Sequence, residues 1–354
     1  MGWLAGTRDR RLRHERRTAA PKALTPPWGA GPQGLGGRMS LLEVRGLQKH
    51  FKVGGATVKA VDGVDFAIDE GETFALVGES GCGKTTIAKL VLMLERPSAG
   101  SILFDGDDLT RLSAKGLHRY RRQVQAVFQD PYASLNPRLR VRTIVAEPIL
   151  AHERPDKATL NRRVAEVLDV VGLPATAADL YPHEFSGGQR QRIAIARALA
   201  LEPRCIVLDE PISALDVSIR AQILNLLADI QQRFKLTYLI IAHDLALVEH
   251  FSNRVGVMYL GNLVETGPTE AVFAQPQHPY TQALLASVPR PDPDHRPPVG
   301  AILGEIGSAI SPPSGCKFHP RCPQAMPVCA TQVPLWRAQG PAQATACHLL
   351  DIPS

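Results

Sequence analysis

The hydrophobic positions change their spacing along the chain, and each spacing predicts a kind of element. Between positions 41 and 68 they fall in short groups among turn residues, which predicts strands and a small sheet. The compact apolar run Thr73-Phe-Ala-Leu-Val77 predicts a buried strand. Glycines follow this run, and a helical spacing then extends from Lys84 to Leu94. The predicted order is strand, glycine-rich turn and helix.

From about residue 130 to residue 184 the apolar spacing is helical, with few strand signals, so we expect a helical insertion there. Strands and helices then alternate again. The pattern predicts a helix from Gly187 to Ala200, a strand from Cys205 to Leu208, a helix from Val217 to Phe234 and a strand from Thr237 to Ala242. Such alternation predicts a parallel sheet and an α/β fold.

The composition changes near Gln275, after which proline is frequent from Pro276 to Pro313. We therefore expect a main domain over residues 40–275 and a C-terminal extension over 276–354. No apolar run approaches the roughly 20 residues that span a bilayer. If the protein works at a membrane, we expect it to lie on the surface.

The formal charge of +6 is concentrated at the start of the sequence. Residues 1–39 contain eight basic and two acidic side chains, which leaves 40 − 8 = 32 basic and 34 − 2 = 32 acidic residues for the rest. The chain after residue 39 has no basic excess, which argues against nucleic-acid binding. Residues 1–39 are expected to be disordered or to precede a true start at Met39. The alternative is an arginine-rich tail for anionic lipid or nucleic acid.

A phosphate-binding loop is predicted between the strand at 73–77 and the next helix. The stretch Gly78-Glu-Ser-Gly-Cys-Gly-Lys-Thr85 has the pattern G-x-x-x-x-G-K-[ST] at the position that its mechanism requires. Backbone N–H groups would wrap a phosphate, Lys84 would reach the terminal phosphates, and Thr85 would ligate Mg²⁺. The expected nucleotide contacts are Gly78, Glu79, Ser80, Gly81, Cys82, Gly83, Lys84, Thr85 and Thr86.

Two adjacent carboxylates end the predicted strand at 205–208. Asp209 could hold Mg²⁺ through water, while Glu210 could orient or deprotonate an attacking water. Two acids at the end of a strand are often only a solvated turn. Their pairing with the phosphate loop favours the catalytic interpretation.

A second helix start carries another anion-binding pattern. In Glu184-Phe-Ser-Gly-Gly-Gln-Arg-Gln-Arg192, Ser186 is expected to cap the helix, and Gly187 and Gly188 expose N–H groups. The alternative is an ordinary capped helix. The stretch resembles the signature sequence of ATP-binding cassette (ABC) proteins, and further motifs follow in the order of that family. Gln129 resembles the Q-loop glutamine, Ser213-Ala-Leu-Asp216 the D-loop, His243 the switch histidine, and Phe51 the aromatic residue that stacks on adenine.

The resemblance covers roughly residues 41–275 and implies the P-loop NTPase fold of an ABC cassette. That fold has a RecA-like parallel-sheet core, an antiparallel β subdomain and a helical subdomain. It implies ATP hydrolysis with Glu210, His243 and Gln129 as catalytic residues, and Mg²⁺ held by Thr85, Gln129 and Asp209. In this family two cassettes dimerise head to tail, so the signature residues would cover a partner's nucleotide. These residues are Ser186, Gly187, Gly188 and Gln189.

Three further stretches are similar to the ATPase subunits of oligopeptide and dipeptide importers. They are Gln129-Asp-Pro-Tyr-Ala-Ser-Leu-Asn-Pro137, His278-Pro-Tyr-Thr281 with the following Ala-Leu-Leu, and Pro312-Pro-Ser-Gly-Cys-Lys-Phe-His-Pro-Arg-Cys322. The sequence departs from that pattern at Ile212, where Ser, Thr or Val is more common, and over residues 307–310, which lack an expected proline. These departures leave the substrate subgroup open.

Four of the six cysteines lie near the C-terminus. Cys316, Cys322, Cys329 and Cys347 are enough for a tetrahedral metal site or a four-iron cluster. The similarity to the peptide importers implies a [4Fe-4S] cluster, which we favour over zinc. The alternative is four reduced thiols without a ligand.

The resemblance predicts the ATP-hydrolysing subunit of an importer for oligopeptides or dipeptides. Its expected partners are an identical or sister cassette, two transmembrane permeases and an extracytoplasmic substrate-binding protein, with no nucleic acid. Its expected place is the cytoplasmic face of the bacterial plasma membrane, as a peripheral subunit. The alternative is a soluble ABC ATPase that acts in translation or DNA repair. Nickel, opines, glutathione and sugars remain open as cargo.

Overall fold

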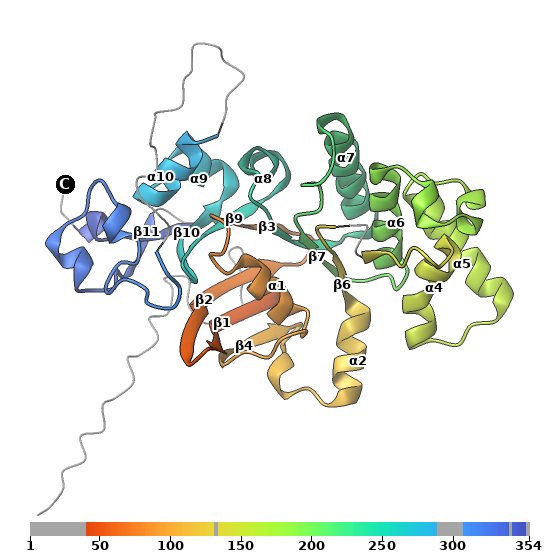
Figure 1. Ribbon diagram of the computed structural model, residues 1–354, viewed down its shortest axis with the longest axis horizontal. Helices are drawn as coiled ribbons and strands as arrows, with labels where there is room; N and C mark the ends of the chain where they lie inside the picture. Colours follow the sequence, from red (N-terminus) through yellow and green to blue (C-terminus); the bar gives the residue numbers. More distant parts are fainter. Residues whose placement is uncertain (1–39, 131–133, 289–306, 340–341, 352–354) are drawn as a thin grey trace, which may run out of the picture.

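The computed structural model describes residues 40–130, 134–288, 307–339 and 342–351 (Figure 1). Within these ranges the chain forms an eight-stranded sheet of order β11-β12-β10-β9-β3-β8-β7-β6 and a four-stranded sheet of order β2-β1-β4-β5. Residues 1–39, predicted to be disordered or to precede the true start, lie outside the described residues.

The elements follow one another in the order of their labels. The strands are β1 (Ser40–Val53), β2 (Ala56–Asp69), β3 (Thr73–Val77), β4 (Ala99–Phe104), β5 (Asp107–Asp108), β6 (Val124–Val127), β7 (Cys205–Asp209), β8 (Thr237–Ile241), β9 (Arg254–Tyr259), β10 (Asn262–Pro268), β11 (Trp336–Gln339) and β12 (Gln343–Ala346). The α-helices are α1 (Lys84–Val91), α2 (Ala114–Gln123), α4 (Val141–His152), α5 (Lys157–Val170), α6 (Gly187–Leu199), α7 (Val217–Phe234), α8 (Leu245–Phe251), α9 (Thr269–Ala274) and α10 (Pro279–Ala286). Short 3₁₀ turns lie at Leu109–Arg111, Ala175–Asp179, Pro182–Glu184, His319–Arg321, Pro327–Ala330 and His348–Asp351.

The centre of the large sheet is parallel, as the alternation of strands and helices predicts. Strand β3 pairs in parallel with β8 and β9, β8 pairs with β7, and β7 pairs with β6. Every residue of β3, β7 and β8 is buried, which is typical of strands covered on both faces. The carboxyl ends of these strands meet at one edge, where ligands bind in open α/β sheets.

The two faces of this sheet belong to two hydrophobic cores. Along β3, Ala75 and Val77 point into one core, while Phe74 and Leu76 point into the other. The first core contains the apolar faces of α6, α7 and α8, including Ile193, and the second contains α1 and the antiparallel sheet. The parallel sheet is therefore sandwiched, with the nucleotide-loop helix α1 on one side and the signature helix α6 on the other.

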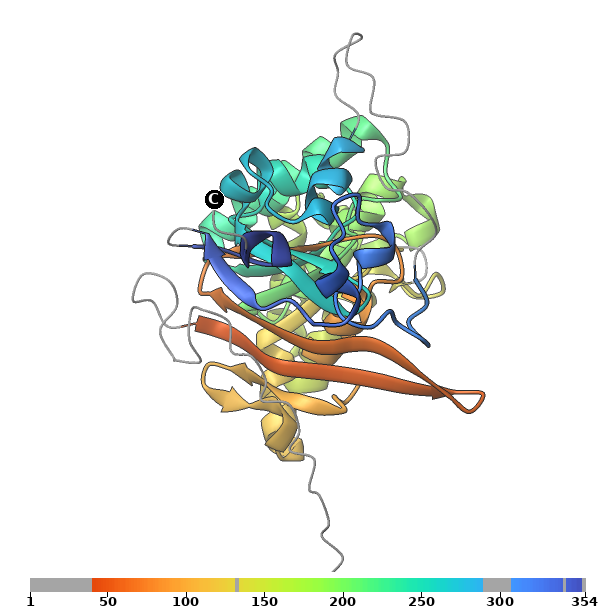
Figure 2. The same ribbon diagram turned by 90° about the vertical axis from the view of Figure 1, so that its left-hand side faces the viewer.

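The strands predicted between positions 41 and 68 form one long antiparallel hairpin. Strands β1 and β2 each have 14 residues, and Val53 lies opposite Ala56. The two-residue turn is Gly54-Gly55, and both glycines have positive φ, as the favoured hairpin turn requires. Figure 2 shows this hairpin and β4 lying along one side of the main sheet. This is the antiparallel subdomain that the family resemblance predicts.

The predicted insertion between residues 130 and 184 is helical in its described part. Helix α4 packs on α5 and α6, and Figure 1 shows the three helices together at one end of the molecule. Asp156 caps α5 by accepting hydrogen bonds from the backbone N–H groups of Ala158 and Thr159. The α/β core, the antiparallel sheet and this helical layer together confirm the predicted fold class.

The chain after residue 275 joins the main sheet. Strand β12 pairs with β10, with Glu265 opposite Thr345, and β11 pairs with β12 in turn. The boundary that the proline content predicts near Gln275 therefore falls between two strands that become neighbours. Helix α1 also ends earlier than its apolar spacing predicts, at Val91, because Met93 has a φ of 52°. Among the described residues, no helix combines the length and apolar character needed to cross a membrane.

Candidate nucleotide and catalytic site

The phosphate loop connects β3 to α1 and depends on two of its glycines. Gly78 has a φ of 146°, and a Cβ there would lie 2.2 Å from the carbonyl oxygen of Met258. Gly83 has a φ of 110°, and a Cβ there would lie 2.2 Å from the carbonyl oxygen of Ala60 on β2. Because backbone lies so close on both sides, a side chain cannot be accommodated at either position. The loop is thus packed closely between the backbones of β9 and β2.

Lys84 starts helix α1 and is almost fully buried, with 6% of the residue exposed. Its Nζ atom donates hydrogen bonds to the carbonyl oxygens of Gly78 at 2.7 Å and Glu79 at 3.0 Å. The ammonium group therefore lies inside the turn formed by the loop. A positive charge and a helix N-terminus together favour binding of a phosphate at this place.

The expected magnesium ligands on β7 and α1 are adjacent. The side chain of Thr85 lies beside the carboxylate of Asp209 and favours its charged form. Burial raises the pKa of Asp209, and the negative charge of Glu210 adds to the rise. A buried carboxylate and a hydroxyl are oxygen ligands of the kind that Mg²⁺ prefers. The pair fits a Mg²⁺ ion held next to the phosphate loop.

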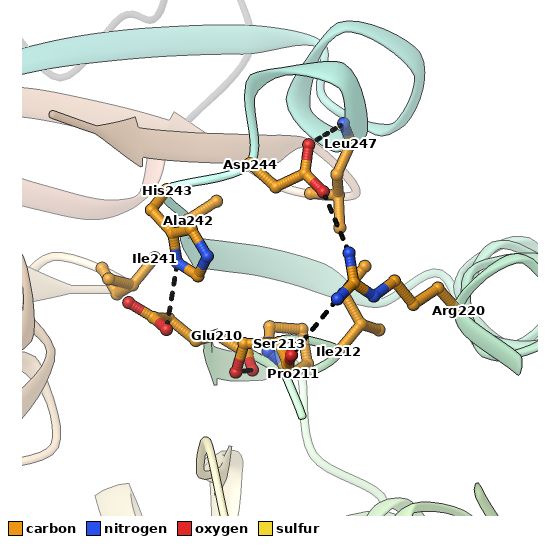
Figure 3. A pocket seen from close by; sticks show the side chains of 10 residues that line it. All are labelled: Glu210, Pro211, Ile212, Ser213, Arg220, Ile241, Ala242, His243, Asp244 and Leu247. Atoms are coloured by element: carbon orange, nitrogen blue, oxygen red, sulfur yellow. Dashed lines mark hydrogen bonds and ion pairs between the residues drawn. The ribbon is translucent and has the colours of Figure 1, made fainter. Parts of the chain in front are cut away.

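Glu210 joins three of the predicted motifs in one cluster. Its Oε2 atom accepts a hydrogen bond from Nε2 of Gln129 at 2.8 Å. The same atom lies 3.1 Å from Nδ1 of His243, as Figure 3 shows. Its backbone is in the left-handed region with a φ of 50°, held by the bond from its N–H to the carbonyl oxygen of Ile241. Such strain in a non-glycine residue is concentrated at functional sites. The three residues come from the ends of β6, β7 and β8.

Arg220, which no sequence motif indicates, connects the D-loop to the segment that follows His243. Arg220 of α7 donates hydrogen bonds to the carbonyl oxygens of Leu215 and Ser213, and lies 3.7 Å from the carboxylate of Asp244. Figure 3 shows it between the segment after Glu210 and the segment after His243. Its two hydrogen bonds go to backbone carbonyls of a loop, so no pattern of side chains in the sequence identifies them.

The signature segment begins helix α6 as the sequence predicts. The Oγ atom of Ser186 accepts a hydrogen bond from the N–H of Gln189, and the Oε1 atom of Gln189 accepts one from the N–H of Ser186. This capping box typically contributes about 1 kcal/mol to helix stability. Gly188 approaches α7, since a Cβ there would lie 2.6 Å from Cγ2 of Ile219. Figure 1 shows α6 well apart from α1, so the signature residues and the phosphate loop do not meet within one chain.

Phe51 lies on β1 with its ring partly exposed. It pairs with Val58 on β2, two residues before Ala60, whose carbonyl oxygen borders the phosphate loop at Gly83. Lys49 places its Nζ atom 4.8 Å from the ring centroid. The aromatic ring is thus on the strand pair that flanks the loop, and its stacking on adenine stays a prediction.

The four cysteines of the tail are free thiols with a shared environment. Burial, together with smaller electrostatic effects of Cys316, Cys322 and Cys329, raises the pKa of Cys347 to about 11. Among the described residues, however, no group of three or more His, Cys, Asp or Glu side chains is placed to hold a metal ion. The described part of the tail therefore contains no preformed single-ion site that would support the predicted metal.

The tail also touches the phosphate loop, which the sequence does not reveal. The guanidinium group of Arg321 donates to both carboxylate oxygens of Glu79, at 2.7 and 3.0 Å, and the hydroxyl of Tyr280 accepts a hydrogen bond from the N–H of Glu79 at 2.9 Å. Arg321 and Tyr280 both lie in stretches that resemble the peptide importers. Their partner could not be identified because 242 and 201 residues separate them from it.

Two protein-family models match the chain. The model described as ABC transporter matches residues 61–213, and the model described as oligopeptide/dipeptide transporter, C-terminal region, matches residues 264–329. The first match contains the phosphate loop and the pair Asp209 and Glu210. The second contains Tyr280 and Arg321.

Curated relatives resemble the chain over nearly their whole length. A putative oligopeptide transport ATP-binding protein of Bacillus subtilis, YkfD, is 52% identical over 317 residues, covering 88% of this chain and 96% of that protein. The oligopeptide transport ATP-binding protein AppF of the same organism is 49% identical over 322 residues, covering 88% and 97%. A putative peptide import ATP-binding protein of Brucella ovis is 52% identical over 307 residues, covering 87% and 97%.

Solved structures of two cassettes share the fold. CbiO1 from Clostridium perfringens, part of an ABC transporter complex, has a TM-score of 0.60 and 31% identity, covering 67% of this chain and 91% of that one. The cassette MJ0796, solved as a dimer bound to ADP and Pi, has a TM-score of 0.59 and 29% identity, covering 64% and 98%. With these matches and the phosphate loop, signature and catalytic cluster in place, the chain belongs to the ABC transporter ATPases, within the group that carries the oligopeptide/dipeptide transporter C-terminal region.

Proposed function

We propose that the protein is the ATP-hydrolysing subunit that powers an importer of oligopeptides or dipeptides. The observation that carries this proposal is the cluster in which Glu210 contacts Gln129 and His243, at the sheet edge that also holds Lys84 and Asp209. A carboxylate held by two side chains beside a phosphate loop is suited to activating water against a terminal phosphate. The peptide cargo is inferred from the relatives YkfD and AppF, which are oligopeptide transport ATP-binding proteins.

In this proposal two cassettes, identical or sister chains, close head to tail on ATP. The phosphate loop of one chain holds the nucleotide, and Thr85, Gln129 and Asp209 of that chain hold Mg²⁺. Ser186 and its neighbours in the signature segment cover it from the other chain. The monomer favours this arrangement because it has two helix-start anion sites far apart and one lysine-bearing loop. The cassette MJ0796, solved as a dimer bound to ADP and Pi, is a precedent for a dimer of cassettes.

We place this motor at the cytoplasmic face of the plasma membrane, bound to two permeases that receive substrate from an extracytoplasmic binding protein. The division into residues 40–275 and 276–354 remains part of the proposal.

A direct test of the proposed function is affinity purification of the tagged protein from detergent-solubilised membranes, followed by mass spectrometry. Two multi-span permeases in the eluate are expected. A soluble-fraction protein that brings ribosomes or DNA would instead support a role in translation or DNA repair.

We also propose that Cys316, Cys322, Cys329 and Cys347 hold a four-iron cluster. The support for this proposal is that the extension supplies four thiols, the number that a four-iron cluster requires. Among the described residues, no group of side chains is placed to hold a single metal ion. Anaerobically purified protein is expected to absorb visible light, and replacing the four cysteines by serine should remove that absorbance. A colourless protein that contains zinc, or no metal, would contradict the cluster. Cys205→Ser, which removes a thiol outside the tail, is the control.

A further inference from the structure

Glu79 is the second residue of the phosphate loop, and the chain beyond residue 275 holds it at two points. Arg321 forms two hydrogen bonds to its carboxylate, and Tyr280 accepts one from its backbone N–H. Both contacting residues lie outside residues 61–213, the part that matches the general ABC transporter model. The segment that matches the peptide-transporter C-terminal model therefore contacts the phosphate loop, which lies within the general ABC transporter match.

The arginine is held rigidly in this position. Only 7% of its side chain is exposed, and it also donates to the hydroxyl of Tyr259 at 3.3 Å. It lies in the turn His319–Arg321, whose N–H groups bond back to Cys316 and Phe318. A bidentate arginine–carboxylate pair fixes orientation as well as charge, because two parallel bonds fix the angle between the groups.

The contact leads directly to the lysine of the phosphate loop. The carbonyl oxygen of Glu79 accepts a hydrogen bond from Nζ of Lys84. The peptide before and after Glu79 is therefore fixed by Tyr280 and Lys84, and the side chain between them is fixed by Arg321. A shift of Glu79 would move the partner that holds the lysine.

The same contact controls charge at the loop. An uncompensated carboxylate of Glu79 would repel a nucleotide that carries several negative charges. Arg321 compensates it, and this pairing raises the pKa of the guanidinium group further above its ordinary value. Glu79 is 21% exposed in its side chain, so the interaction is partly protected from screening by salt.

We infer that Arg321 is a positioning residue for ATP binding, which neutralises Glu79 and fixes the phosphate loop from the C-terminal extension. This inference rests on the proposed function, since it assumes that the loop binds ATP. It assigns to the extension a part in nucleotide affinity. Because Arg321 stands next to Cys322, the fold of the cysteine tail then bears on how tightly the protein holds ATP.

The test is the dissociation constant of a fluorescent ATP analogue with Mg²⁺, measured on purified full-length variants. Arg321→Gln is expected to weaken binding about ten-fold, because it leaves the charge of Glu79 exposed to the phosphates. Adding Glu79→Gln to that variant should restore the affinity to within about three-fold of wild type. The deficit of the single variant should also shrink as salt is raised.

The matched control is Lys317→Gln. Lys317 ties the same tail to Asp62 and to the carbonyl oxygen of Leu260, with no hydrogen bond to Glu79 among those formed by its side chain. It should leave the affinity within about two-fold of wild type, since it weakens the tail without changing the charge of the loop. An equal loss in Lys317→Gln and Arg321→Gln, or a double variant as weak as Arg321→Gln, would overturn the inference.

Thermal unfolding of each variant identifies any that fail to fold. If Arg321→Gln does, Arg321→Lys decides the matter, because it keeps the charge and loses the paired geometry. Arg321→Lys is expected to bind ATP about three-fold more weakly than wild type, which corresponds to the loss of about one hydrogen bond. Unchanged affinity contradicts a positioning role. Wild-type protein that binds no ATP would refute the proposed function instead, so the two failures are distinguishable.

Discussion

Replacing Glu210 by glutamine is expected to slow ATP hydrolysis at least about 100-fold while ATP still binds. The carboxylate ends strand β7 and contacts Gln129 at 2.8 Å and His243 at 3.1 Å. Glutamine has nearly the same size and preserves the packing, but an amide cannot accept a proton from an attacking water. Phosphate release and nucleotide affinity, measured on the same preparation, separate the chemical step from binding.

The loss of hydrolysis should also stabilise the closed dimer, because ATP that is not consumed continues to bridge the two chains. Size-exclusion chromatography in ATP should therefore show more dimer for Glu210→Gln than for wild type. Glu249→Gln is the matched control, since Glu249 is an exposed glutamate on helix α8 after the switch histidine. Normal turnover in Glu210→Gln would remove this residue from the catalytic role.

The positions of the candidate catalytic residues could be predicted because their signals are local. The phosphate loop, the pair Asp209 and Glu210, and His243 each follow a buried strand directly, and parallel strands bring their carboxyl ends to one edge. The structure brings Gln129, Glu210 and His243 together as that argument requires. Gln129 and His243 were assigned from their resemblance to the Q-loop and switch motifs, and the direction of the strands explains why they meet Glu210.

Short elements with little periodicity were harder to predict. Strand β5 has two residues and β6 has four, which is too few for an alternating pattern to stand out.

Pairing between strands that are distant in the sequence was also hard to predict, as the region around the expected boundary near Gln275 shows. Proline content marks a change in composition, yet strand β12 returns across 70 or more residues to pair with β10, with Glu265 opposite Thr345. Pairing at such separation depends on packing of the whole chain.

Buried polar contacts across the chain could not be predicted for the same reason. His278 is 1% exposed, and its Nδ1 atom accepts a hydrogen bond from the N–H of Tyr280, which places the tyrosine hydroxyl at Glu79. In the sequence these residues belong to a short motif of the importer branch, with no sign of its partner. Burial lowers the pKa of His278 to about 3, so this histidine remains neutral and acts as a helix cap.

Replacing Lys84 by alanine is expected to weaken ATP binding about 100-fold or more, equivalent to about 2.7 kcal/mol. The lysine is almost fully buried at the start of α1, and its Nζ atom bonds the carbonyl oxygens of Gly78 and Glu79. Alanine removes the positive charge and also removes the donor that holds these two carbonyls. The dissociation constant of ATP with Mg²⁺ is the quantity to measure.

The control for Lys84→Ala is Lys89→Ala, which removes an exposed lysine from the same helix. Its effect should stay within about three-fold, because an exposed charge is screened by water and salt. If the two variants lose affinity equally, the general positive charge of α1 attracts ATP and the buried position of Lys84 is not decisive. A large loss confined to Lys84→Ala means that the nucleotide is held by a cation fixed within the loop, so the geometry of that loop sets the affinity.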